Sequence, residues 1–358
     1  MRIGIVGLPN AGKSTLFNAL TGAGAQTGDY PFTTIDPNIA VVPIHDERLE
    51  RVARVVGSSE VVPETIAFHD IAGLVRGASR GEGLGNRFLA AIRETDAICH
   101  VVRCHRSGDV PHLEGRVDPL DDVDLVETEL LAADLDGAER RLDRITKLAR
   151  SGGAEQVAER DWLAAVVEAL GAGRPAREVP APQAARRAPA RLHALTSKPV
   201  LYVANIEEGE NEVPAALVEH ASRVGAVAVA ISARLEADLS DLGDPAEEAE
   251  MRAELKAGES GLGRLIGAAF DLLGLISFFT ADEGKEAMAR NVRAGSTAHE
   301  AAAKVHTDIQ KRFVRAEVIA WGDLVEAGGY AAARERGLLR TEGREYVVAD
   351  GDVLTIRV

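Results

Sequence analysis

The stretch that decides the fold is IGIVGLPNAGKSTLFNALTG, residues 3–22. IGIV predicts a short buried strand, GLPNAGKST is a Gly-rich turn, and LFNALTG repeats apolar residues at the helical period. Strand, Gly-rich turn and helix, in this order, form the context that the phosphate-binding motif G-x-x-x-x-G-K-[ST] requires. The sequence therefore predicts an α/β domain built around a P-loop.

The residues of this loop have separate expected tasks. Gly7 and Gly12 permit backbone angles closed to other residues, so successive amide N–H groups can wrap phosphates at the positive end of a helix. Lys13 is expected to act in catalysis by neutralising the β- and γ-phosphates, and the Ser14 hydroxyl is expected to bind Mg²⁺. A chance Gly-rich turn is the weaker alternative, because the whole motif is present in its expected context.

Two later segments supply the other expected contacts with metal and phosphate. In YPFTTIDPN, a polar stretch bounded by prolines, Thr33 and Thr34 are both available as a metal ligand. TIAFHDIAGL predicts a strand that ends in Asp70, with Gly73 three positions later. We expect Asp70 to hold the hydration shell of Mg²⁺ and the Gly73 amide to sense the γ-phosphate.

The position after Gly73 departs from Ras-like enzymes. They place a water-orienting Gln there, whereas this chain has Leu74, which cannot hydrogen-bond water. His112, in HRSGDVPHLEG, is the candidate catalytic replacement because an imidazole can position or deprotonate water near neutral pH. A solvated loop histidine is the alternative, and it is the commoner case.

The base-reading segment also differs from that of a GTPase. After the apolar run VLYVA, the usual Asn-Lys-x-Asp is replaced by NIEE, so that Asn205 remains but Ile206 and Glu208 replace Lys and Asp. Asn205 can still bond a purine N7, whereas Glu208 is one methylene too long to hold the bidentate position on guanine. Losing that contact should relax or reverse the preference for guanine. The chemistry indicates ATP.

A further apolar run, VAVAI, is followed by Ser232 and Ala233 in the pattern Ser-Ala-x-x-Glu. This resembles the loop whose backbone packs against the purine in GTPases. All the nucleotide-binding elements thus occur in the order of a G-domain.

Length, charge and cysteine content limit the remaining possibilities. A chain of 358 residues predicts two or three domains, and a net charge of −15 disfavours nonspecific attraction to DNA. No apolar run approaches the ~20 residues of a membrane helix, and the N-terminus goes straight into a strand, so we expect a cytoplasmic protein without membrane contact. The two cysteines, Cys99 and Cys104, lie near several histidines, but their spacing argues against zinc.

The middle of the chain predicts a helical hairpin. Apolar residues from Leu131 to Ala149 recur at steps of three and four, SGG interrupts the pattern, and a second run continues from Leu163 to Leu170. The following Pro- and Arg-rich stretch, GRPAREVPAPQAARRAPARL, predicts an exposed linker. The hairpin tip could contact RNA or protein, or it could be a solvated arm.

The C-terminal part has short β-rich runs, LISFFT, RAEVIA, YVVAD and VLTIRV, around one helix expected in TAHEAAAKVHTDIQKRF. A small mixed sheet around a helix is typical of a β-grasp domain. Despite the acidic background, this region has a dense basic cluster that could dock a phosphate backbone or merely solubilise a helix face. Its members are Lys304, His306, Lys311, Arg312 and Arg315.

Four segments together, GLPNAGKSTLFNALT, DIAGLVRGASRGEGLGNRFL, NIEE and GREYVVADGDV, closely resemble the YchF-type Obg-like ATPases, a branch of the Obg-related P-loop GTPases. The resemblance implies ATP hydrolysis in preference to GTP, association with the ribosome, a helical insertion and a C-terminal TGS domain. With the patterns above, it divides the chain into a G-domain (1–122 and 198–274), a coiled-coil insertion with linker (123–197) and a TGS β-grasp domain (275–358).

The resemblance also carries site residues over to this chain. It assigns Asn205 and Ile206 to adenine binding. Between Thr33 and Thr34, it favours Thr34 as the Mg²⁺ ligand. Asn10 matches a P-loop asparagine linked to K⁺ dependence in related enzymes. The phosphates are assigned to Asn10, Ala11, Gly12, Lys13, Ser14 and Thr15.

We therefore expect a cytoplasmic ATPase that uses Mg²⁺ and K⁺, hydrolyses GTP less well, and binds the ribosome. The expected partner is the large subunit, with rRNA contacts through the TGS domain or the helical arm. Three alternatives stay open at this point: a conventional GTPase, a dual-specificity NTPase, and a ribosome-binding scaffold in which nucleotide mainly orders the G-domain.

Overall fold

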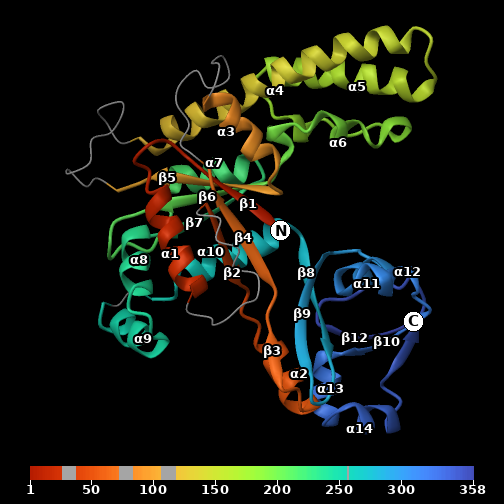
Figure 1. Ribbon diagram of the computed structural model, residues 1–358. Coiled ribbons are helices and arrows are strands. Elements are labelled where there is room, and N and C mark those ends of the chain that lie inside the picture. Colours follow the sequence, from red (N-terminus) through yellow and green to blue (C-terminus); the bar gives the residue numbers. More distant parts are fainter. Residues whose placement is uncertain (26–37, 72–83, 106–117, 256–257) are drawn as a thin grey trace. The chain divides into compact units, whose positions relative to one another are not determined.

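The computed structural model describes residues 1–25, 38–71, 84–105, 118–255 and 258–358 (Figure 1). The chain divides into two compact units. The first comprises Met1–Val42 and Ala67–Ala268, and the second comprises Pro43–Ile66 and Ala269–Val358. Within the described residues, no helix combines the length and the apolar character that crossing a membrane requires.

The first unit is built on a six-stranded sheet with the order β2-β4-β1-β5-β6-β7. The register shows that β4, β1, β5, β6 and β7 run parallel to one another. The central strand β5 is buried at all seven positions, as expected for a strand covered on both faces. The strands are β1 (Arg2–Val6), β2 (Ile39–Pro43), β4 (Thr65–Asp70), β5 (Ala97–Arg103), β6 (Val200–Asn205) and β7 (Val227–Ile231).

Helices cover both faces of this sheet. One face packs against α3 (Leu84–Arg93), α4 (Pro119–Ala149) and α7 (Ala215–Arg223) through two apolar clusters. The opposite face carries α1 (Lys13–Ala25) and α10 (Gly261–Leu272), as Figure 1 shows. Two further helices, α8 (Ala233–Ser240) and α9 (Pro245–Glu254), follow β7. The layered architecture confirms the predicted α/β class.

The predicted helical hairpin is present. It consists of α4 and α5 (Ala154–Gly171), and the predicted apolar seam packs between them, with Ala138 and Ile145 buried. The carboxylate of Glu159, 1% exposed, pairs with Arg141 of α4 and with Arg191 of the following segment, the latter at 2.8 Å. The carboxylate is the buried member of this group, whereas Arg191 is 42% exposed, so the two arginines compensate a charge that Glu159 holds inside the hairpin.

The Pro-rich stretch after the hairpin is not simply an exposed linker. It forms two short 3₁₀ helices and one α-helix, a third 3₁₀ helix follows it, and Ala176, Ala185 and Ala188 are buried against the hairpin. Prolines lie just before or in the first turn of these helices, where the backbone N–H has no hydrogen-bond partner within the helix. The prolines therefore mark where short helices begin, and not an irregular linker. The elements are η1 (Ala176–Glu178), η2 (Gln183–Ala185), α6 (Ala188–Leu192) and η3 (Leu195–Ser197).

The second unit contains a mixed six-stranded sheet with the order β11-β10-β12-β8-β9-β3. Most neighbours are antiparallel, whereas β12 with β8, and β3 with β9, are parallel. The strands are β3 (Glu60–Val62), β8 (Leu275–Ala281), β9 (Glu286–Arg293), β10 (Arg315–Ala320), β11 (Arg340–Glu342) and β12 (Asp352–Arg357). Three of the four predicted β runs are confirmed. YVVAD is wrong as a strand, because it makes only an isolated bridge from Val347 to Thr297.

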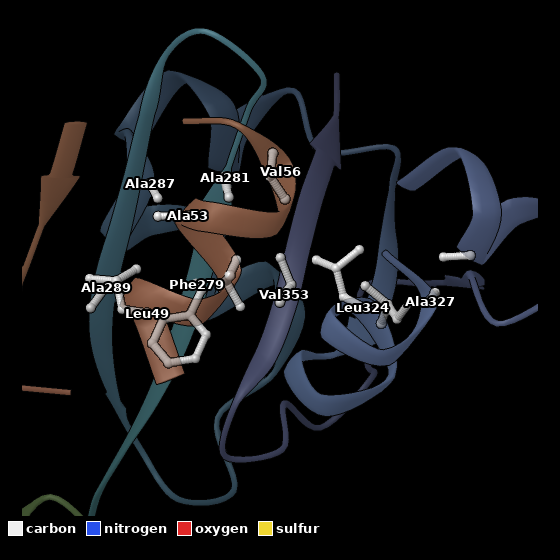
Figure 2. Close-up of a cluster of buried hydrophobic side chains, with 13 residues drawn as sticks. Leu49, Ala53, Val56, Phe279, Ala281, Ala287, Ala289, Leu324, Ala327 and Val353 are labelled. Atoms are coloured by element: carbon white, nitrogen blue, oxygen red, sulfur yellow. The ribbon is translucent and has the colours of Figure 1, made fainter. Parts of the chain in front are cut away.

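Helices cover both faces of this second sheet, whereas the sequence analysis expected a sheet around one helix. Phe278 and Phe279 are adjacent in β8 and therefore point to opposite faces. Phe278 packs with α11 (Ala298–Val305), and Phe279 packs with α2 (Glu47–Val56) and α13 (Trp321–Ala327), as Figure 2 shows for the second cluster. The remaining helices are α12 (Thr307–Lys311) and α14 (Tyr330–Glu335). The single helix predicted over TAHEAAAKVHTDIQKRF is interrupted at His306, whose Nδ1 accepts a hydrogen bond from the Asp308 amide and caps α12.

Residues 43–66 correct the predicted domain division, which placed them in the G-domain. The apolar face of α2, which includes Leu49 and Val52, packs in the core of the second unit, and β3 pairs with β9. The helical segment 123–197, expected as a separate domain, lies within the first unit. The division therefore follows packing partners and not chain order.

We expect Leu49→Ala to destabilise the second unit. Leu49 is 1% exposed, and removing a buried Leu side chain costs about 2–4 kcal/mol. Hydrogen exchange should quicken in β8 and β9 while β5 and β6 keep their protection. Leu148→Ala is the control, because Leu148 is 61% exposed and its truncation should change stability by less than about 0.5 kcal/mol. Faster exchange confined to β5 and β6 would contradict the assignment of residues 43–66.

Candidate nucleotide-binding site

The predicted site residues gather at one edge of the first sheet. Asp70 and Asn205 are the last residues of β4 and β6, the P-loop follows β1, and Ser232 follows β7. Because these strands are parallel, their carboxyl ends meet at the same edge, which is where open α/β sheets bind ligands. Thr34, Gly73 and His112 lie outside the described residues.

Backbone geometry explains the glycines of the loop. Gly7 has φ 150° and Gly12 has φ 99°, values that side chains rarely permit. A Cβ atom on Gly7 would lie 2.4 Å from the Val101 carbonyl oxygen, and one on Gly12 would lie 2.2 Å from Nδ2 of Asn205. Asn10 also adopts a left-handed conformation, with φ 65°. The loop is thus folded tightly against β5 and β6.

Lys13 is held inside this loop. Its side chain is 8% exposed, and Nζ donates a hydrogen bond to the Leu8 carbonyl oxygen at 2.7 Å. Burial lowers the pKa of the ammonium, and the nearby Asp70 carboxylate opposes that shift. An ammonium has three donors, so this hydrogen bond leaves two for phosphate oxygens. The position suits the predicted role of neutralising phosphate.

Asp70 and Ser14 are the two described residues that we predict to act on the metal. Asp70 is half-buried at the end of β4; burial raises the pKa of its carboxyl and Lys13 opposes the shift. Ser14 is exposed in the first turn of α1. A hydroxyl and a carboxylate are oxygen ligands of the kind that Mg²⁺ prefers. Their chemistry fits the ion.

Asn205 connects the P-loop to α8. Its Nδ2 donates to the Ala11 carbonyl oxygen at 3.0 Å, and its Oδ1 accepts from the Ala233 amide at 3.1 Å. The side chain is 6% exposed. A side-chain amide carries two N–H donors, so one remains for a purine N7 after the contact with Ala11. Asn205 is therefore a structural link as well as the predicted base contact.

The other residues of NIEE divide between core and surface. Ile206 is 4% exposed, its side chain packs in the cluster with Val102 and Leu217, and its amide bonds to the Ile231 carbonyl oxygen at 3.0 Å. Because the side chain lies in the core, we expect the predicted contact of Ile206 with the base to be made by its main chain. Glu208 is exposed, beyond the end of β6.

Ser232 is the N-cap residue of α8 and Ala233 is its first residue, and Glu236 explains how this segment is held. Glu236 is 5% exposed and receives two hydrogen bonds from Arg252, each 3.0 Å long, and one from the Gly261 amide at 2.8 Å. It thereby ties α8 to α9 and to the start of α10. The sequence pattern contains Glu236, but only the structure identifies Arg252 as its partner.

Arg103 is a residue at this edge that sequence reasoning missed. It ends β5 in register with Asn205, is 2% exposed, and donates from Nε to the His105 carbonyl oxygen at 3.4 Å. The sequence did contain an indication of this role, because Arg103 is a charged residue at the end of a largely apolar strand. Nearby, Cys99 is buried and Cys104 is half-buried; over the described part of the chain, no group of three or more His, Cys, Asp or Glu could hold a metal ion.

Comparisons with known proteins cover the whole chain. A family model described as a 50S ribosome-binding GTPase matches residues 2–133, and a model for the C-terminal part of YchF GTPases, described as a protein of unknown function, matches residues 275–358. The chain is 45% identical over 361 residues to the Bacillus subtilis protein named ribosome-binding ATPase YchF, covering 99% of this chain and 98% of the relative. A protein of the same name from Haemophilus influenzae is 46% identical over 359 residues, with the same coverage.

A solved structure agrees with these matches. The Schizosaccharomyces pombe YchF GTPase has a TM-score of 0.88 and 32% sequence identity to this chain. The similarity covers 100% of this chain and 97% of that protein. Both the P-loop domain and the C-terminal domain are thus shared with it, which confirms the predicted fold class.

We expect Gly12→Ala to weaken nucleotide binding at least about tenfold, because strain of this kind costs roughly 1–3 kcal/mol. The new Cβ atom must displace Asn205 from the Ala11 carbonyl oxygen, in a backbone conformation that alanine disfavours. Titration with a fluorescent ATP analogue measures the change. Gly137→Ala in α4 is the matched control, because nothing lies within 4 Å of its Cβ position. Equal affinities in both variants would refute the proposed packing of the loop.

Proposed function

The chain belongs to the YchF family, and from that premise we propose that it is a Mg²⁺-dependent ATPase switch that binds the ribosome and hydrolyses GTP less well. The observation that carries the nucleotide preference is the segment NIEE. Its Asn205 is fixed between the P-loop and α8, while Glu208, in the place of the guanine-reading Asp, lies exposed.

Phosphate binding would use the start of α1 and the loop before it. Lys13 offers its two remaining donors, and we assign phosphate binding to the residues from Asn10 to Thr15, which lie at the N-terminus of α1, where anions are stabilised. Ser14 and Asp70 would hold Mg²⁺ directly and through water, with Thr34 as a further ligand and the Gly73 amide near the γ-phosphate. The ion would supply charge neutralisation of the phosphate oxygens.

The proposed preference for adenine follows from the absence of the acceptor pair that guanine requires. A guanine site needs an acceptor pair for N1–H and the 2-amino group, and adenine has neither donor in that arrangement. Glu208 is longer than Asp and exposed, so it does not supply that pair in a desolvated position. The conventional GTPase and the dual-specificity NTPase are the alternatives, and relative affinity for ATP and GTP separates them.

Two features of hydrolysis belong to the proposal as well. K⁺ near Asn10 would contribute the positive charge that an arginine finger brings in other enzymes. His112 would position or deprotonate the attacking water, since Leu74 offers no hydrogen bond for that purpose. The alternative of a scaffold with vestigial hydrolysis predicts ribosome binding without turnover.

The ribosome is the proposed partner for two reasons. Relatives that are 45% and 46% identical to this chain are named ribosome-binding ATPase YchF, and this chain has a positively charged surface. All five residues of the basic cluster, Lys304 to Arg315, are exposed on α11, α12 and the start of β10. Clustered cations attract phosphate backbones even on an acidic protein. We propose that this surface or the helical arm contacts rRNA of the large subunit in the cytoplasm.

We expect ATP to bind more tightly than GTP, and the double variant Ile206→Lys with Glu208→Asp to shift the preference toward GTP by about tenfold or more. The variant rebuilds Asn-Lys-x-Asp and restores the acceptor pair. Calorimetric titration with both nucleotides measures the shift.

We also expect Lys13→Ala to abolish ATP hydrolysis while the protein still folds, because Lys13 neutralises phosphate charge. A phosphate-release assay measures turnover in this variant.

Glu208→Ala is the control for the test of base preference. If Glu208 only fails to read guanine, its removal should leave ATP affinity unchanged, whereas a direct adenine contact would make it fall. A wild-type preference for GTP of about tenfold or more would overturn the inference from NIEE and favour the conventional GTPase.

Replacing Na⁺ with K⁺ at constant ionic strength should accelerate ATP hydrolysis, and Asn10→Ala should abolish the difference. The reason is that the proposed K⁺ site supplies charge that stabilises the transition state. Steady-state phosphate release in the two salts measures the effect. Equal rates in wild type would remove K⁺ from the mechanism.

A further inference from the structure

The first unit contains a second cavity, of about 300 Å³, that is distinct from the nucleotide site. Its lining comes from β5, β6, α4, α7 and the segment after α5, and it includes no residue of the P-loop or of NIEE. Figure 1 shows these elements where the hairpin meets the sheet. A volume of this size is at the lower end for sites that bind small molecules.

Much of the cavity wall is apolar. The side chains come from β5 and β6, from α4, from η3 and from the position after α7: Ile98, Val126, Leu130, Leu195, Val200 and Val224. Such a wall favours a ligand with an apolar body, because polar groups buried there would lose hydrogen bonds to water.

One polar wall of the cavity is already satisfied by its own hydrogen bonds. Arg223 donates to Nδ1 of His220 at 2.9 Å, so Nε2 of His220 carries the proton that it shares with Glu127 at 3.1 Å. The hydroxyl of Tyr202 also donates to Glu127. This chain of contacts has no need of a ligand.

His100 is different. It lines the cavity and is 2% exposed, its ring lies 5.6 Å from that of Tyr202, and its buried Nε2 has no hydrogen-bond partner. Burial lowers the pKa of His100 to about 4, so the ring is neutral near pH 7. An unsatisfied buried polar atom destabilises the folded state and is usually given a partner.

The charged residues around the cavity balance one another. Arg174, Arg177 and Arg223 face Asp124, Glu127 and Glu178, and Arg174 approaches Glu178 at 3.9 Å. Three positive and three negative groups give the lining no net preference for an anion or a cation. The unsatisfied nitrogen and the apolar wall therefore determine what fits.

We propose that this cavity binds a small uncharged heteroaromatic molecule that forms a hydrogen bond with the imidazole of His100 beside the ring of Tyr202. The flat apolar body matches the wall, and the ring heteroatom gives the imidazole of His100 a hydrogen-bond partner. This site is independent of the nucleotide site and does not rest on the proposed ATPase activity.

Benzimidazole is a suitable probe, because it is neutral at pH 7.5 and carries both a donor and an acceptor, so it fits either tautomer of His100. Indene has nearly the same shape and neither group. We expect the full-length protein to bind benzimidazole at least about tenfold more tightly than indene, the difference that one hydrogen bond to a buried group makes. Ligand-observed NMR titration measures both affinities.

Two variants test the location. His100→Phe keeps an aromatic ring but removes the nitrogen, so it should bring the affinity for benzimidazole down to that for indene. Val224→Trp should fill the cavity and abolish binding of both probes. Val218→Trp is the matched control on α7, since Val218 is 45% exposed and does not line the cavity. It should bind as the wild type does.

Three results would overturn the proposal. They are the absence of benzimidazole binding at about 5 mM, a concentration at which even weak fragments bind, affinity unchanged by both His100→Phe and Val224→Trp, and displacement of the probe by ADP. The first would mean that an ordered water satisfies His100, and the last would place the probe in the nucleotide site.

Discussion

The nucleotide edge of this protein depends on one side chain, Asn205. Its amide joins the Ala11 carbonyl oxygen to the Ala233 amide and so holds together segments that lie 194 and 28 positions away in the sequence. The bridge is possible only because Gly12 has no Cβ atom, which would lie 2.2 Å from Nδ2. P-loop shape and base-loop position are thus set by the same contact, so the phosphate site and the base site are built as one structure.

Much of this site could be predicted because each residue answers a local requirement. The P-loop needs glycines at fixed positions, a lysine and a hydroxyl, and the parallel sheet brings the strand ends together. The hairpin could also be predicted, since the apolar residues between its helices repeat at the helical period and the repeat ends at SGG. By contrast, the partner of Glu236 could not be predicted, because Arg252 lies on a separate helix and no local sequence pattern connects the two residues.

The membership of residues 43–66 shows where a sequence pattern reaches its limit. The periodicity of α2 indicates that Leu49, Val52 and Val56 will be buried, but it does not say against what. Chain order suggested the first sheet, whereas the packing surface is the second. YVVAD failed for a related reason: its β-forming residues lie in an irregular segment held by one bridge at Val347, so propensity was overridden by tertiary context.

Strands β5 and β6 serve both the nucleotide edge and the cavity. His100 pairs in register with Tyr202, and three positions later Arg103 pairs with Asn205, a separation of about 10 Å along the strands. The two strands are hydrogen-bonded and buried almost throughout, so they resist bending. The cavity is also lined by two helices, α4 and α7. Of these, α4 also forms half of the hairpin, so a ligand in the cavity would contact the start of the arm as well as the two strands that lead to the nucleotide edge.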